Sequence, residues 1–226
     1  MSEGIPDQLR DYDLLKVCGP NCASHTDCDN EGKRPVGSAT DGPFYRASDP
    51  DLVRHIKNGG NVGFPLSGPI VVFDVDNTRL GELLDDKLPP TFTVQTGSGG
   101  QHRYYHAPEW TDDRQLNIDG ADYGSIRSDG WQVVVPPSVH PDTGEQYQIE
   151  EDRVITSVGN HEIEKVLDAL GIDTASQHSG GGSGGSAAAA GCAGGSSLPS
   201  LPDEYPNRPA EWKTLRSWLS SNGILE

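Results

Sequence analysis

The chain of 226 residues is long enough for one mixed α/β domain with a sizeable core, or for such a domain with an appendage. Its formal net charge of -17 argues against a broad basic surface for nucleic acid. Adaptation to high salt produces the same acidic balance, and net charge would then say nothing about partners. No apolar stretch approaches the length of a membrane span, and the N-terminus lacks a basic segment followed by an apolar one. We therefore expect a cytoplasmic protein with no membrane contact, whose four cysteines are reduced thiols or metal ligands.

The first motif along the chain is a cysteine-rich segment, residues 18–28. Its four candidate zinc ligands are Cys18, Cys22, His25 and Cys28. Four such ligands close together can complete a tetrahedral Zn2+ site, which would be structural because protein fills every position. The alternative is a polar loop with free cysteines.

Local signals predict the elements that follow. The acidic cap at Asp49, with Pro50 behind it, predicts a helix that ends at about Lys57. Residues 61–66 resemble a strand, and the turn after them predicts a hairpin into the next strand. The small basic segment 32–35 is interpreted as a solvated turn. A short amphipathic helix is expected over residues 79–87 and a strand over residues 91–95.

An apolar strand over residues 69–77 ends in two acidic residues, Asp74 and Asp76. Residues two apart in a strand project to the same side, so the two carboxylates lie together and repel each other. A divalent cation relieves that repulsion, and Mg2+ commonly uses one or two carboxylates plus substrate phosphates. The alternative is a strand that ends in a solvated, Asp-rich turn.

A glycine-rich turn at residues 96–101 precedes another strand. Such a turn exposes backbone N–H groups and lets an anion approach closely. Ser98, Gly99 and Gly100 lie in the turn, and His102, which opens the strand, is placed to contact a phosphate or a metal. The alternative is an ordinary hairpin with a partly buried histidine.

The C-terminal half divides into a folded part, a linker and a tail. Residues 121–135 predict a strand, a turn and an apolar strand, and residues 161–170 predict a helix closed by Gly171. We assign the folded domain to residues 1–173 and a flexible Gly/Ser/Ala linker to residues 174–198. Residues 199–226 predict an amphipathic helix that either docks on a partner or folds back onto the domain.

The order of these segments resembles the bifunctional primase/polymerase domain of archaeal plasmids, viruses and mobile elements, within the archaeo-eukaryotic primase superfamily. The resemblance covers roughly residues 10–170 and rests on the segments 18–35, 69–76, 96–102, 126–127 and 133–147. It implies an α/β fold of the mixed α+β kind, with a central, mostly antiparallel sheet and flanking helices. Together with the acidic balance, it indicates a haloarchaeal chain or one from a haloarchaeal mobile element.

The resemblance also implies an activity: DNA primase or polymerase nucleotidyl transfer on single-stranded DNA, with (d)NTPs and Mg2+ or Mn2+. By position, Asp74 and Asp76 become metal ligands and catalytic residues, together with His102. The nucleotide contacts become Ser98, Gly99, Gly100, His102 and Arg127. A replicative helicase, or another replication protein, becomes a candidate partner for the C-terminal helix.

One position departs from the family pattern. The family's third acidic residue falls at Ser125, and a hydroxyl cannot supply the charge of a carboxylate. Asp122 is near, but three residues away along a strand it should face the opposite side unless a bulge intervenes. Three explanations remain: a deliberately inactivated variant, a natural protein with weakened catalysis, or an alignment that is shifted here. Two rivals to the primase reading also stand: a catalytically poor nucleotide- and DNA-binding module that recruits a helicase, and a metal-dependent nuclease that uses the same acids.

Overall fold

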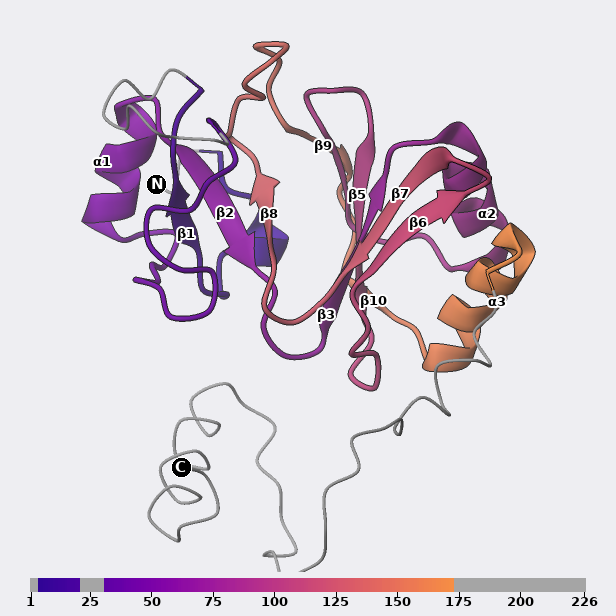
Figure 1. Cartoon of the computed structure of the whole chain (residues 1–226). Helices are drawn as coiled ribbons and strands as arrows, with labels where there is room; N and C mark the ends of the chain where they lie inside the picture. The colour runs from indigo at the N-terminus through magenta and orange to yellow at the C-terminus, as the bar shows by residue number, and fades with distance from the viewer. Residues whose placement is uncertain (1–3, 21–30, 173–226) are drawn as a thin grey trace, which may run out of the picture. The chain divides into compact units, whose positions relative to one another are not determined.

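The computed structural model of the protein describes residues 4–20 and 31–172. Its strands form two sheets, and Figure 1 shows α1 (Pro50–Lys57) beside the smaller sheet and α2 (Thr78–Lys87) and α3 (Asn160–Leu170) beside the larger one. A short 3-10 helix, η1 (Asp7–Leu9), precedes them. The expected mixed α/β fold is confirmed.

The larger sheet is built around β3, the apolar strand that ends in the acids. It has the order β6-β7-β3-β5-β4-β9, and β10 pairs with β5. These strands are β3 (Ile70–Val75), β4 (Thr93–Gln95), β5 (Gln101–His106), β6 (Arg114–Ile118), β7 (Ala121–Arg127), β9 (Gln148–Glu151) and β10 (Thr156–Ser157). Every pairing is antiparallel except that of β10 with β5, as expected for a mostly antiparallel central sheet.

The smaller sheet contains three strands in the order β1-β2-β8. They are β1 (Leu15–Val17), β2 (Asn61–Pro65) and β8 (Gln132–Val135). The predicted hairpin between β2 and the acid strand is therefore wrong, because β2 pairs with β1 and β8 while β3 lies in the other sheet. The strands β7 and β8 are also consecutive in the chain but belong to different sheets.

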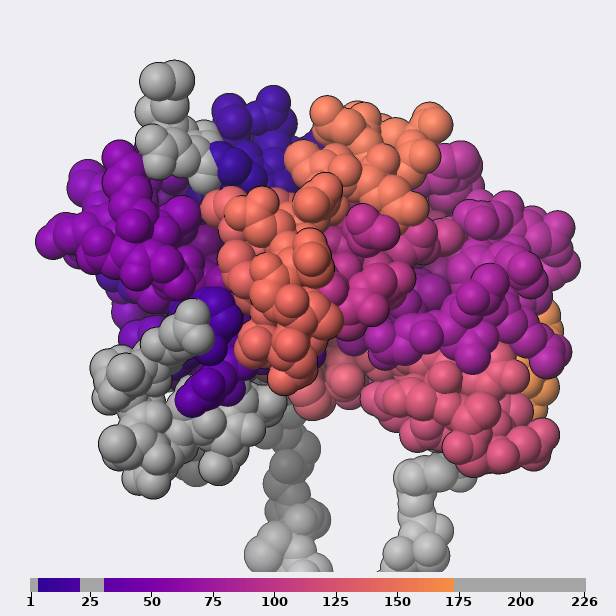
Figure 2. All heavy atoms as spheres, turned by 90° about the horizontal axis from the view of Figure 1, so that it is seen from above, coloured from indigo at the N-terminus to yellow at the C-terminus, as the bar shows by residue number. Residues whose placement is uncertain are grey.

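The two faces of β3 belong to two different cores. Val71 and Phe73 pack with apolar residues of α2 and α3. Val72, on the opposite face, packs with Phe64 and other residues of the smaller sheet. Side chains alternate along a strand, so Asp74 follows Val72 onto the face that turns toward the smaller sheet. In the view from above, the segment that follows β8, salmon to orange in colour, lies between the purple N-terminal elements and the magenta larger sheet (Figure 2).

The helices begin and end where their capping residues predict. The Asp49 side chain accepts a hydrogen bond from the Asp51 N–H at 2.8 Å, at the N-terminus of α1. Asn77 caps α2 in the same way, and Gly171 ends α3 with a φ of 77°. Among the described residues, no helix is both long enough and apolar enough to cross a bilayer.

Candidate active site

The strand register brings three sequence-predicted site positions into one row. Asp74 in β3 is the direct partner of His102 in β5 and of Ser125 in β7. Directly opposed residues in an antiparallel pair project to the same side. The acid, the histidine and the serine at the expected third acidic position therefore share one face of the larger sheet.

His102 contacts the first acid directly. Its Nε2 lies 3.4 Å from Asp74 Oδ1, and the His102 side chain is 8% exposed whereas that of Asp74 is 29% exposed. Burial raises the pKa of Asp74, but the hydrogen bond with His102, the charge of a protonated His102 and the positive charges of Arg127 and Lys33 outweigh it and hold the pKa below its usual value. Asp74 is thus kept as a carboxylate.

The pKa of the second acid, Asp76, shifts in the opposite direction. Loss of solvent, followed by the negative charges of Asp74 and Asp122, raises the pKa of Asp76 above its usual value. Carboxylates that repel one another in this way suit a divalent cation, and their hard oxygen atoms are the ligands that Mg2+ and Mn2+ prefer. Asp74 and Asp76 therefore fit such an ion by charge and by donor type. Across residues 4–20 and 31–172, no three His, Cys, Asp or Glu side chains are already grouped as a metal site.

The glycine-rich turn lies against the acids. A Cβ atom at Gly100 would come within 2.6 Å of the Val75 carbonyl oxygen and 3.3 Å of Asp76 Oδ1, so only glycine allows this approach. Ser98 is exposed, and its hydroxyl lies 3.0 Å from that of Thr96. Within the described part of the chain, no acceptor meets the backbone N–H of Ser98 or of Gly100. The turn can thus offer N–H donors to an anion beside Asp76.

Arg127 is near the acids but is held by other groups. It lies on the Asp74 face of β7, because its partner is Val72, two residues before Asp74. Its guanidinium is 3.4 Å from Asp113 Oδ2 and stacks 4.2 Å from the centre of the Trp131 ring. Its positive charge still contributes to the low pKa of Asp74. A phosphate contact by Arg127 would have to compete with Asp113.

Three further residues border the site, and sequence reasoning assigned them no role. Tyr147 lies with its ring centre 5.9 Å from that of His102 and 6.2 Å from that of His140. The exposed Lys33, expected only in a solvated turn, lowers the pKa of Asp74 and opposes the rise in the pKa of Asp76. The presence of Lys33 in the one basic segment of an acidic chain was the available signal.

The remaining predicted ligands divide between described and undescribed residues. Cys18 is buried at 3% exposure, and its N–H donates to the Arg34 carbonyl at 2.9 Å. Cys22, His25 and Cys28 lie outside the described residues, as do the predicted linker and tail helix at 174–198 and 199–226. The zinc site and the division of the chain into these segments remain sequence-based predictions.

The fold and the site define a mixed α/β domain that presents paired carboxylates, a buried histidine and a glycine-rich turn on one face of an antiparallel sheet. The model of the family described as bifunctional DNA primase/polymerase, N-terminal, matches residues 15–164, and the chain belongs to this family. No curated protein matches the chain. Membership indicates a nucleotidyltransferase of the DNA primase/polymerase type, a class that binds DNA and nucleotides and generally uses divalent metals.

Proposed function

We propose that this chain catalyses template-directed nucleotidyl transfer on single-stranded DNA, using (d)NTPs and Mg2+ or Mn2+, in the replication of a plasmid, virus or mobile element. The observation that carries the proposal is the pairing of Asp74 with His102 across β3 and β5, together with the packing of Gly100 in the glycine-rich turn against Asp76. A triphosphate bound here would need both negative ligands for its metal and donors for its oxygens, and this arrangement offers both.

Each group has a distinct task in this proposal. Asp74 and Asp76 hold the divalent cation, which when bound neutralises the triphosphate and aligns the 3'-hydroxyl with the α-phosphate. The N–H groups of Ser98 and Gly100 bind phosphate oxygens. His102 orients Asp74 through Nε2 and faces the nucleotide, and Arg127 adds positive charge when a phosphate displaces Asp113.

One observation favours a second candidate, a catalytically poor module that binds nucleotide and DNA and recruits a helicase. Ser125 stands opposite Asp74, where the family carries a third acid, and it is 1% exposed. A hydroxyl there leaves the site one negative charge short, which would weaken the hold on a metal. Ser125→Asp would then raise nucleotide incorporation, whereas a fully active wild type with no gain from Ser125→Asp would rule out a deficit at this position.

The test is incorporation of labelled dNTP on a primed single-stranded template with Mg2+ or Mn2+, over a range of KCl concentrations. We expect Asp74→Asn to abolish incorporation. Asp119→Asn is the matched control, because it removes the same charge from an exposed turn and should leave incorporation near wild type. Incorporation that survives Asp74→Asn would contradict the proposal.

The same reactions distinguish the other candidates. A helicase-recruiting module would bind dNTP and DNA without incorporation, and a nuclease would cleave the strand without added nucleotide. Activity that rises with KCl would support the proposed high-salt source, since an acidic surface is suited to strong screening. Metal analysis of the purified protein tests zinc at Cys18, Cys22, His25 and Cys28.

A further inference from the structure

A β-bulge interrupts β7 just before Ser125. Ser125 pairs with Gln115 of β6, but the next pair joins Asp122 with Asn117. Three steps along β7 therefore match two steps along β6, so β7 carries one extra residue between these pairs. The extra residue lies at Tyr123 or Gly124, next to the acid strand.

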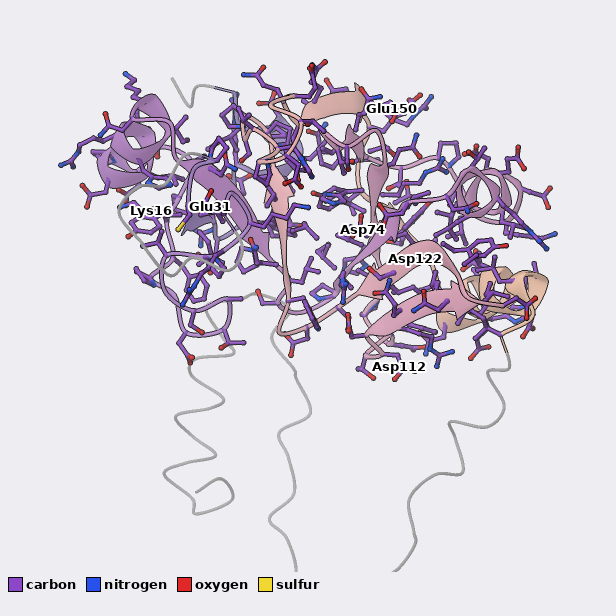
Figure 3. The ribbon with its side chains drawn as sticks, turned by 45° about the horizontal axis from the view of Figure 1, so that its top comes forward. Lys16, Glu31, Asp74, Asp112, Asp122 and Glu150 are labelled. Carbon is purple, nitrogen blue, oxygen red and sulfur yellow. The ribbon has the colours of Figure 1, made fainter. Side chains whose placement is uncertain are left out.

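The bulge changes which face Asp122 occupies. Gln115 and Asn117 are two apart in β6 and share a face, and each projects to the same side as its β7 partner. Asp122 therefore shares the face of Ser125, which is also the face of Asp74. Strict alternation would place Asp122 on the opposite side unless a bulge intervenes, and this bulge brings it to the same side. Figure 3 shows Asp74 and Asp122 on the neighbouring strands β3 and β7.

Gly124 makes this arrangement possible. It has a φ of 120°, and a Cβ atom there would lie 1.9 Å from the Asp74 carbonyl oxygen. The bulge thus brings β7 against the backbone that carries the acid, and the Asp76 N–H donates to the Tyr123 carbonyl at 3.3 Å. Only a residue without a side chain allows this contact.

The Asp122 carboxylate is oriented by two donors. Its Oδ1 accepts hydrogen bonds from the Gly124 N–H at 2.9 Å and from Gln115 Nε2 at 3.0 Å. Among the described residues no donor meets Oδ2, so one oxygen remains available for a ligand. A carboxylate fixed in this way costs little further ordering when an ion binds.

Two observations connect Asp122 to the proposed metal site. The first is its place on the face of Asp74, one strand away across the β3–β7 pair. The second observation is His102, more than nine-tenths buried on the same face, with Nε2 directed at Asp74. Its Nδ1 has no hydrogen-bond partner in the described part of the chain.

We propose that Asp122, carried onto the active face by the bulge, supplies the third carboxylate of the metal site in place of the residue at position 125. This inference rests on the proposed function, because it gives Asp122 a role toward the same cation. It predicts that the chain retains strong metal binding and catalysis despite Ser125. Asp122 acts either on the ion itself or through a water molecule bound to it.

The test measures Mn2+ affinity of the full chain by electron paramagnetic resonance of the free ion, without nucleotide or DNA. We expect Asp122→Asn to weaken Mn2+ binding about tenfold. Asp119→Asn removes the same charge three residues away, in the exposed β6–β7 turn, and should change affinity by less than about twofold. Equal effects of the two variants would overturn the inference.

A charge relocation adds a second test. In Asp122→Asn/Ser125→Asp the carboxylate moves to the family position opposite Asp74, and Mn2+ affinity should recover. A folded double variant as weak as Asp122→Asn would overturn the inference, because the loss would not come from the missing charge. If the double variant fails to fold, the comparison of Asp122→Asn with Asp119→Asn decides the matter alone.

Asp74→Asn separates this inference from the function on which it rests. If Asp74→Asn abolishes Mn2+ binding while Asp122→Asn equals its control, only the assignment of Asp122 fails. If Mn2+ binding survives Asp74→Asn, the proposed metal site fails as well.

Discussion

Ser125 lies directly opposite Asp74 across the β3–β7 pair, and its side chain is almost fully buried. Opposed residues in an antiparallel pair are the closest neighbours that a sheet provides. A second carboxylate at position 125 would therefore face Asp74 at short range and away from bulk water. What it does to the protein depends on whether a cation is present.

We predict that Ser125→Asp destabilises the metal-free protein by about 3 kcal/mol, because it buries an unpaired charge beside Asp74. Saturating Mn2+ should restore about 1–3 kcal/mol of that loss through preferential binding to the folded state. Urea unfolding with and without Mn2+ measures both effects. Ser128→Asp is the control: Ser128 is 2% exposed and donates to the Thr111 carbonyl, and its replacement should cost stability equally in both conditions. If Ser125→Asp loses the same stability with and without Mn2+, the result would contradict a cation beside Asp74.

Arg127 gives a prediction about nucleotide binding. Arg127→Gln should weaken dNTP binding about tenfold or more, because a charge-assisted contact to phosphate is worth about 1.5–3 kcal/mol. Arg114→Gln removes the same charge from the neighbouring strand, where Arg114 pairs with Asp112 at 3.0 Å, and should bind dNTP like wild type.

The stacking of Arg127 on the half-exposed Trp131 provides the signal for this measurement. Nucleotide that draws the guanidinium away from the ring, 4.2 Å from its centre, should change tryptophan fluorescence. The change should be absent in Trp131→Phe. A dNTP affinity that is the same in Arg127→Gln and Arg114→Gln would remove Arg127 from the nucleotide site.

Tyr105 gives a prediction about pH, in the core on the helical side of the sheet. Its ring packs edge-on against Phe73, its hydroxyl donates to the Pro89 carbonyl at 3.2 Å, and burial raises the pKa of Tyr105 to about 12. Because the folded pKa exceeds the unfolded value of about 10, stability from this group is complete below pH 10 and is lost as the pH rises toward 12.

Tyr105→Phe removes this titration together with the hydrogen bond. At pH 8 the free energy of unfolding of the variant should be about 1 kcal/mol below that of wild type. At pH 11 wild type should have lost about 1 kcal/mol through Tyr105, so the two free energies of unfolding should be nearly equal. Urea unfolding at the two pH values measures the difference. Parallel losses of stability would show that Tyr105 ionises equally in the folded and unfolded chains.

Several elements follow from the sequence because their causes are local. Asp49 and Pro50 start α1 where a cap and a first-turn proline should, and the apolar run of β3 requires burial on both faces. Alternation alone places Asp74 on one side of β3. Alternation within one strand cannot place His102 beside it, because two strands distant in sequence must pair in one particular register. Only the family resemblance predicts this placement.

The features that the sequence did not predict depend on pairing across the molecule. The turn after β2 looks like a hairpin turn, but β2 pairs with β1 and β8 instead. The apolar residues of these three strands pack in a separate core. The bulge in β7 is equally nonlocal, because it exists only relative to β6. Without that register, Asp122 is assigned to the wrong face and Ser125 appears as a lost charge. Gly124 was the one sequence signal, since glycine inside a strand often marks a bulge.

Gly124 therefore provides a stringent test of the bulge. Gly124→Ala places a methyl group where the Asp74 carbonyl oxygen is 1.9 Å away, at a φ of 120° that L residues rarely adopt. Gly120, in the same hairpin, has a φ of 81° but nothing within 4 Å of its would-be Cβ. Both substitutions strain the backbone, by about 1 kcal/mol. Only Gly124→Ala adds a collision, so it should cost about 3 kcal/mol or more in urea unfolding.

The bulge also positions Asp122, so the two glycine variants should differ in metal binding as well as in stability. Gly124→Ala pushes β7 away from β3 and disturbs the Gly124 N–H that donates to Asp122 Oδ1, so Mn2+ affinity should fall. Gly120→Ala should bind Mn2+ like wild type. If folded Gly124→Ala keeps wild-type Mn2+ affinity, the close approach of β7 to β3 does not set the position of Asp122. The third carboxylate would then have to reach the site in some other way, because the bulge is what places it on the face of Asp74.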